Sequence, residues 1–169
     1  MEKWDLYKIE NNKIVLTDLD CVRGDVIPKG FYHLVVHVWI KNSKGEYLMS
    51  KRSSDRPRYP LLWECPGGSV LKGENSLDGA LREVFEEVGL AIKLLPGFKS
   101  EDEYPIPQKE NTIKQIVYFL GEYCNQEFTY QKEELTDALL FDYETAMTLF
   151  QFESSKRILT EANNFLLGR

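Results

Sequence analysis

The chain has 169 residues, a length that suits one well-buried domain and is short for two. Its 27 acidic and 21 basic residues give a formal net charge of -6, which argues against a nucleic-acid duplex as a general partner. No apolar run is long enough to span a bilayer and the N-terminus lacks the hydrophobic segment of a signal peptide, so we expect a cytoplasmic protein without a membrane partner.

The cysteines Cys21, Cys65 and Cys124 are odd in number and widely separated. This arrangement fits reduced thiols better than a disulfide framework or a zinc site. We expect all three to be ordinary core or surface residues.

The N-terminal segment from Trp4 to Leu19 predicts a strand or a hairpin, with Asn11-Asn12-Lys13 as the turn. Glycine and proline between Arg23 and Gly30 then predict a loop. We therefore expect residues 1–30 to form an extension in front of a domain of residues 31–169, the two together making a single globular unit.

The next predicted strand, Phe31–Ile40, is apolar on both faces apart from His33 and His37, which indicates a central strand covered on both sides. The two histidines share one face and would line a pocket together, although strand histidines are more often structural and no third ligand completes a zinc site. A turn at Asn42–Gly45 and a return strand at Glu46–Arg52 follow.

The densest basic cluster of the chain comes next, in a segment that two prolines keep out of regular structure. One interpretation is recognition of a diphosphate, and the alternative is a solvated group of surface cations. The cluster comprises Lys51, Arg52, Arg56 and Arg58.

A helix is predicted over Ser76–Val88, because Asn75 or Ser76 offers an N-cap oxygen and Gly89 supplies a left-handed stop. Helical spacing also places Glu83, Glu86 and Glu87 on one patch. The apolar stripe beside that patch is predicted to consist of Leu77, Ala80, Leu81, Val84 and Val88.

The remaining elements alternate between strands and helices, which suits an α/β fold with a mixed sheet and helices on both faces. In chain order they are a broken strand over Ala91–Phe98, a polar loop over Ser100–Asn111, a strand over Thr112–Tyr123, an acidic loop over Gln126–Glu134, a short strand over Ala138–Asp142, and helices over Glu144–Phe150 and Glu153–Leu167.

The predicted helix and the glycine-rich turn before it carry a motif of fixed spacing. The motif consists of Gly68, Glu74, Arg82-Glu83-Val84, Glu86-Glu87 and Gly89-Leu90. A match of this kind is expected by chance in roughly one in 10 million chains of this length. The chain thus resembles the Nudix hydrolases of the MutT/Nudix superfamily, and the resemblance covers this box without a departure.

The resemblance implies an α/β/α sandwich and an enzyme that hydrolyses a diphosphate bond in a nucleoside-diphosphate-linked or related small molecule with Mg²⁺, for which Mn²⁺ is a possible substitute. It implies that Glu83, Glu86, Glu87 and the Gly67 carbonyl bind the metal. Oxygen ligands of this kind suit a hard cation. Glu83 is our first candidate for the residue that takes a proton from water, and Glu86 is the second.

The resemblance gives Arg82 and Glu74 an orienting role, since an arginine fork can hold a carboxylate by two parallel hydrogen bonds. Arg52 and Arg56 would grip the substrate diphosphate. A homodimer is compatible with all of these assignments.

Other parts of the chain resemble the branch that contains isopentenyl diphosphate isomerase, and an isomerase is one alternative function. They are Trp4-Asp5-Leu6-Tyr7, Gly30-Phe31-Tyr32-His33, Val36-His37-Val38-Trp39 and Lys51-Arg52-Ser53. That isomerase has a degenerate box and needs a cysteine where Gly68 stands here, while Cys65 comes too early. A module that binds a nucleotide without catalysis is a second alternative, which the intact box disfavours.

The substrate itself stays open at this level. Pro105 lies at a spacing associated with ADP-ribose hydrolases, and Tyr104 lies near a position associated with dinucleoside polyphosphate hydrolases. Both residues are equally consistent with an ordinary turn.

Overall fold

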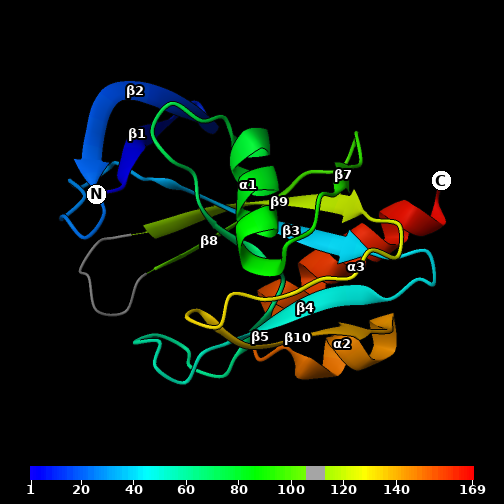
Figure 1. Cartoon of the computed structure of the whole chain (residues 1–169). Helices are drawn as coiled ribbons and strands as arrows, with labels where there is room; N and C mark the ends of the chain where they lie inside the picture. The colour runs from blue at the N-terminus through cyan, green and yellow to red at the C-terminus, as the bar shows by residue number, and fades with distance from the viewer. Residues whose placement is uncertain (106–112) are drawn as a thin grey trace.

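A computed structural model describes residues 1–105 and 113–169, with the side chains of Tyr104, Pro105 and Ile113 outside that description. No helix in these two ranges is both long and apolar enough to cross a membrane. The elements are β1 (Lys3–Glu10), β2 (Lys13–Val22), β3 (Leu34–Lys41), β4 (Tyr47–Arg52), β5 (Trp63–Glu64), β6 (Gly67–Ser69), α1 (Ser76–Val88), β7 (Lys93–Leu94), β8 (Ser100–Pro105), β9 (Ile113–Glu122), β10 (Leu135–Phe141), α2 (Tyr143–Leu149) and α3 (Glu153–Leu167) (Figure 1).

The main sheet is mixed, as predicted. Its strands run in the order β10-β4-β3-β9-β7, with β5 paired to β4, β6 to β3 and β8 to β9. The pair β3 and β9 is parallel and the other pairs are antiparallel. Figure 1 shows α1 in front of this sheet and α3 behind it, so the predicted α/β/α sandwich is confirmed.

Strand β3 carries both halves of the hydrophobic core, because successive side chains of a strand point to opposite faces. Val36 and Val38 belong to the cluster that α1 covers. Val35 and Trp39 belong to the cluster that α2 and α3 cover. The prediction of a central strand covered on both sides is therefore confirmed.

The sheet opens between β3 and β4. These two strands pair only through Ile40 with Leu48 and Lys41 with Tyr47. Beyond this short ladder, β4 pairs with β5 and β3 pairs with β6. The segment that joins β5 to β6 therefore lies in the opening between β3 and β4.

The N-terminal segment, predicted as a strand or a hairpin, is a hairpin of β1 and β2, with Asn11 and Asn12 in the left-handed region at φ 49° and 58°. It docks on the start of the main domain. Backbone hydrogen bonds of 2.7 and 2.8 Å join Tyr7 to Tyr32. The Trp4 ring stacks on the His33 ring with centroids 4.1 Å apart.

Three sequence predictions about these elements were wrong. Ser100–Pro105 is a strand, β8, and not part of a loop. It pairs with β9 at the edge of the sheet, where polar side chains can face solvent. The rest of that predicted loop, residues 106–112, lies outside the described residues. The strand predicted over Ala91–Phe98 is reduced to Lys93–Leu94. Leu77 and Leu81 are 49% and 39% exposed and do not belong to the buried stripe of α1.

Candidate functional site

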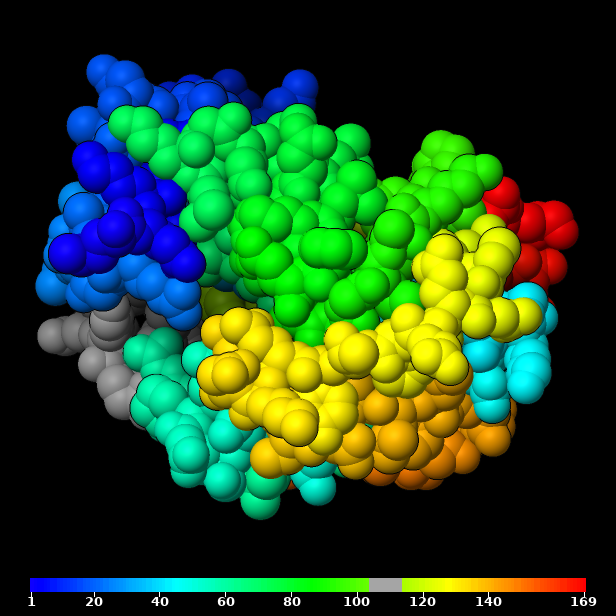
Figure 2. Space-filling view, in the orientation of Figure 1, coloured from blue at the N-terminus to red at the C-terminus, as the bar shows by residue number. Residues whose placement is uncertain are grey.

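A cavity of about 580 Å³ lies where the sheet opens, and Figure 2 shows the molecule hollowed between the N-terminal hairpin, α1 and the segment before β10. Every residue predicted for the site lines this cavity except Glu74. The lining predicted residues are Arg52, Arg56, Gly67, Arg82, Glu83, Glu86 and Glu87.

Helix α1 has the predicted bounds. The side chain of Asn75 caps it by accepting a hydrogen bond of 2.9 Å from the Asp78 backbone N–H, and Gly89 ends it at φ 69°. Its buried face contains Ala80, Val84 and Val88. Because Glu87 lies one turn after Val84 and two turns after Ala80 on that same face, its carboxylate is directed at the sheet rather than at solvent.

Glu87 is a buried carboxylate with little compensation. It is 6% exposed, and its Oε2 accepts one hydrogen bond of 3.0 Å from the Gly67 backbone N–H. Burial raises the pKa of Glu87 well above the usual carboxyl value, and the negative charges of Glu64, Glu83 and Glu134 raise it further. A cation bound here would remove an electrostatic cost that the fold otherwise carries.

Glu83 and Glu86 are joined by Arg82. The Nη1 atom of Arg82 donates to Glu83 Oε1 at 2.9 Å and to Glu86 Oε2 at 3.0 Å. Burial raises the pKa of Glu83 even though Arg82 lowers it. Glu86 is exposed to solvent, with 53% of its side chain accessible.

Arg82 also forms the predicted two-bond pair with Glu74. Its Nε and Nη2 atoms donate to the two oxygens of the Glu74 carboxylate at 2.7 and 3.0 Å, and Nη2 donates to the Ser69 carbonyl at 2.9 Å. The hydrogen bonds from Arg82 hold the pKa of Glu74 below its ordinary value. Arg82 thereby ties α1 to the turn that precedes it.

Strand β6 leaves no free space for a side chain at Gly67 or Gly68: at Gly67 a Cβ atom would meet backbone, and at Gly68 it would displace the end of the Glu83 side chain. A Cβ atom on Gly68 would lie 2.3 to 2.6 Å from the Glu83 carboxyl group, and one on Gly67 would lie 2.1 Å from the Val36 carbonyl oxygen. Both distances are far below van der Waals contact. The paired glycines therefore let the backbone reach the carboxylates directly.

The basic side of the cavity is paired with carboxylates of its own. Arg52 donates to Glu64 Oε1 at 2.8 Å and to the Arg58 carbonyl at 3.2 Å. Arg56 forms an ion pair with Glu134. The predicted cluster thus reaches the cavity, but neither guanidinium group is an unpaired cation.

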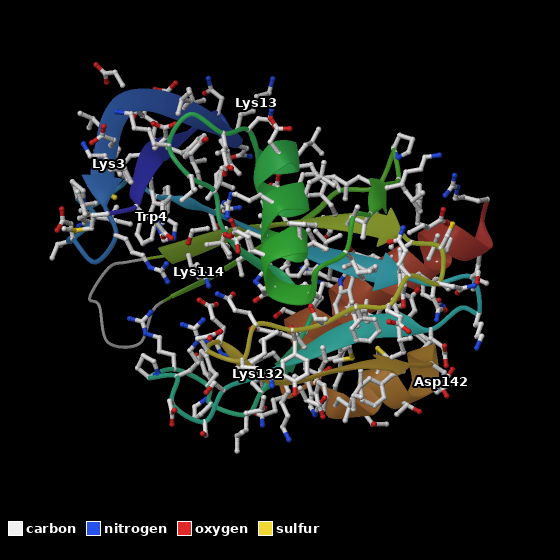
Figure 3. The ribbon with its side chains drawn as sticks, in the orientation of Figure 1. Lys3, Trp4, Lys13, Lys114, Lys132 and Asp142 are labelled. Atoms are coloured by element: carbon white, nitrogen blue, oxygen red, sulfur yellow. The ribbon has the colours of Figure 1, made fainter. Side chains whose placement is uncertain are left out.

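Six charged residues that line the cavity were not predicted for the site from the sequence: Glu2, Arg23, Glu64, Asp102, Lys114 and Glu134. Glu64 and Glu134 line it as partners of the arginines, and Lys114 enters it from β9 (Figure 3). Burial lowers the pKa of the Lys114 ammonium group. The position of Glu64 directly before the Cys-Pro-Gly-Gly turn was a signal for it, whereas Lys114 and Glu134 stand in no motif that we identified.

The remaining predicted residues are also placed by the structure. His33 and His37 both line the cavity, and Trp63 lines it too, with its ring perpendicular to that of Phe141. Cys65 is buried, and burial raises the pKa of its thiol well above normal, so it lacks the thiolate character of a reactive cysteine. The side chains of Tyr104 and Pro105 lie outside the described residues.

The donor atoms that line the cavity indicate which metal ion it could hold. Within residues 1–105 and 113–169, no three acidic, histidine or cysteine side chains converge closely enough to hold an ion, and Arg82 instead bridges Glu83 and Glu86. The available donors are carboxylate and carbonyl oxygens around the buried charge of Glu87. This donor set fits a hard divalent cation better than a soft one.

The chain is similar to known proteins of one family. The family model described as "NUDIX domain" matches residues 31–162. An uncharacterized Nudix hydrolase of Listeria monocytogenes is 38% identical over 139 residues, which cover 82% of this chain and 78% of that protein. The asymmetrical bis(5'-nucleosyl)-tetraphosphatase of Mus musculus is 36% identical over 130 residues, covering 74% of this chain and 83% of that enzyme.

A solved structure has the same fold. The C. elegans Ap4A hydrolase, in a binary complex, superposes with a TM-score of 0.70 and 20% sequence identity, over 81% of this chain and 99% of that one. The match to the family model and the two relatives show the family directly. The chain belongs to the Nudix hydrolases and is an enzyme of the pyrophosphohydrolase type.

Proposed function

We propose that the protein hydrolyses a diphosphate bond, with Mg²⁺, in a nucleoside-diphosphate-linked or related small molecule. The observation that carries the proposal is the buried, weakly compensated carboxylate of Glu87, which shares one cavity with Glu83, Arg52 and Arg56. A divalent cation would neutralise the acidic side, and the arginines would attract the phosphate oxygens of a substrate.

The oxygens of Glu83, Glu86, Glu87 and the Gly67 carbonyl are the groups that would hold the ion, and Mn²⁺ would fit the same donors. When bound, such an ion lowers the pKa of a water ligand and shields the diphosphate from the acidic patch.

Glu83 is our proposed acceptor of the proton that the attacking water loses. Its carboxyl group lines the cavity and accepts a hydrogen bond of 2.9 Å from Arg82, so it is held beside the oxygens that would bind the ion. Arg82 and Glu74 would fix its orientation through their hydrogen bonds. Glu86 is the second candidate.

Arg52 and Arg56 would bind the diphosphate by exchanging their present partners, Glu64 and Glu134, for phosphate oxygens. Their planar forks match two oxygens of one phosphate group. Glu64 and Glu134 would then lose their cationic partners. Their negative charges would be uncompensated near the metal-binding oxygens, where a divalent ion would balance them.

A side chain at position 68, as the isomerase alternative requires, would displace the Glu83 carboxyl group. A cysteine at position 68 would place its Cβ within 2.6 Å of the Glu83 carboxyl group. Gly68 therefore serves a site built around Glu83, and hydrolysis is the better assignment.

The test is turnover of a panel with and without Mg²⁺. The panel contains ADP-ribose, dinucleoside tetraphosphates such as the mouse relative's name suggests, and isopentenyl diphosphate. We expect hydrolysis of a panel member only with Mg²⁺. Glu83→Gln should lower the rate of hydrolysis about 100-fold or more, while its circular dichroism spectrum should match that of the wild type. Turnover without a divalent ion, or an unimpaired folded Glu83→Gln, would contradict the proposal.

A further inference from the structure

The open end of the N-terminal hairpin borders the cavity. Glu2 lies one residue before β1 and Arg23 one residue after β2, and both line the cavity although they stand far from the box in the sequence. The match to the family model begins at residue 31, so both residues lie outside it. Figure 2 shows the hairpin forming one wall of the hollow. The N-terminal extension thus adds a surface of its own to the site.

Hydrogen bonds hold the hairpin against the turn that leads into α1 (Figure 1). The Gly73 backbone N–H donates to the Asp5 carboxylate at 2.7 Å, and the Lys72 backbone N–H donates to the Lys3 carbonyl at 2.8 Å. The Lys72 ammonium group also pairs with Asp20. Because this turn is part of the box, these contacts give the open end of the hairpin a defined position relative to the carboxylates of α1.

Arg23 and Glu2 form an ion pair that leaves hydrogen-bonding groups free. Arg23 Nη1 donates to Glu2 Oε2 at 2.7 Å, and the Arg23 backbone N–H donates to the Glu2 carbonyl at 2.9 Å. Among the described residues, no other group accepts from the guanidinium group, and the second carboxylate oxygen accepts no hydrogen bond. Arginine has five N–H donors and a carboxylate has two acceptor oxygens. Free donors and a free acceptor therefore stand side by side at the edge of the cavity.

We propose that Arg23 and Glu2, together called the hydroxyl site, determine substrate specificity by binding a hydroxyl-bearing group such as a sugar that is joined to the diphosphate. This inference rests on the proposed diphosphate hydrolysis and names the substrate class as sugar-containing diphosphates. A hydroxyl group both donates and accepts, so two neighbouring hydroxyls can accept from Arg23 and donate to Glu2 at the same time. Both bonds involve an ionised partner and are stronger than bonds between neutral groups.

Two other occupants fit the hydroxyl site less well. A further phosphate group would be attracted by Arg23 but repelled by the Glu2 carboxylate beside it. An isoprenyl chain would cover a charged pair and leave its free donors and acceptor without partners, which costs free energy. A hydroxyl-bearing group is uncharged and polar, so it meets neither penalty.

The experiment compares Arg23→Gln with the wild type on the ribose-containing member of the panel that the wild type hydrolyses best. Inorganic diphosphate, which offers phosphate oxygens without a sugar, is the competing inhibitor in the same assay. We expect Arg23→Gln to raise KM about 10-fold and to change kcat little, because a hydrogen bond from a charged group is lost. The Ki of inorganic diphosphate should rise by a clearly smaller factor.

The matched control is Lys8→Gln. It removes the cation of another exposed ion pair of the hairpin, formed with Glu10 at 2.7 Å, and neither residue is among the described residues that line the cavity. Exposed pairs contribute little to stability, so Arg23→Gln and Lys8→Gln should both unfold near the wild-type Tm. Only Arg23→Gln should raise KM. Glu2→Gln is a second test and should also raise KM, since an amide oxygen is a weaker acceptor than a carboxylate oxygen.

An unchanged KM in folded Arg23→Gln and Glu2→Gln would overturn the hydroxyl site and leave diphosphate hydrolysis in place. Equal increases in KM and in the Ki of inorganic diphosphate would do the same, and so would an equal rise of KM in Lys8→Gln, which would assign the effect to the hairpin as a whole. If the wild type hydrolyses isoprenyl diphosphates and no ribose-containing compound, the pair does not bind a sugar. If it hydrolyses no diphosphate at all, the proposed function falls and the hydroxyl site with it.

Discussion

Replacing Glu87 by glutamine tests whether the cavity stores an uncompensated charge. The carboxylate is 6% exposed, accepts one backbone hydrogen bond from the described residues and lies near Glu64, Glu83 and Glu134. Glutamine keeps an oxygen for the Gly67 N–H, and its amide can donate to the neighbouring carboxylates. Removing a buried charge of this kind should stabilise the metal-free protein by about 1–3 kcal/mol, or roughly 2–4 °C in Tm per kcal/mol for a chain of this size.

The assay is thermal unfolding in EDTA and in Mg²⁺, together with turnover. Wild type should gain about 3 kcal/mol from Mg²⁺ at one hundred times its Kd, because the ion binds only the folded state. Glu87→Gln should start from a higher Tm in EDTA, lose most of the response to Mg²⁺ and lose about 100-fold or more in rate. Glu86→Gln is the control for stability in EDTA, since its side chain is 53% exposed and its removal should move that Tm little. A lower Tm of Glu87→Gln in EDTA, or a full response to Mg²⁺, would refute the reasoning.

Three further predictions concern other residues of the site. Arg52→Lys should lower kcat/KM by about 10- to 150-fold, the loss of roughly 1.5–3 kcal/mol from a charged hydrogen bond, and unchanged kinetics would leave Arg52 as the partner of Glu64 alone. Gly68→Ala should fold but lose most turnover, because its new Cβ forces the Glu83 carboxyl group aside; full activity would show that Glu83 can move without consequence. Glu74→Gln should destabilise the protein near neutral pH, and the difference from wild type in urea unfolding should shrink as the pH falls below 4.5, since the pKa of Glu74 is lowered in the fold by Arg82. A difference that persists at low pH would mean that the charge of Glu74 contributes little.

The bounds of α1 followed from the sequence because its determinants are local. Asn75 and Gly89 act on backbone groups within a few residues, and both caps are present as predicted. The rotation of the helix about its axis was not predictable in the same way. Leu77 and Leu81 fit an apolar stripe as well as Glu87 fits an acidic one, yet packing against the sheet buries Glu87 and exposes the leucines.

The parts of the site that the sequence did not reveal depend on contacts between distant segments. Strand β8 reads as a loop because its polar residues are explained only by pairing with β9. Lys114 and Glu134 reach the cavity through the order of strands in the sheet. The box residues, in contrast, are held by one turn and one helix, so their spacing alone was informative.

Because β3 and β4 separate beyond a short ladder, the two faces of β3 serve different parts of the enzyme. Residues of β3 alternate, so that Val36 and Val38 support the helix of the box while Val35 and Trp39 line the far side of the cavity. The side chains of the second set therefore face away from the helix of the box. One face of β3 thus borders the cavity while the other face supports the helix that carries Glu83, Glu86 and Glu87.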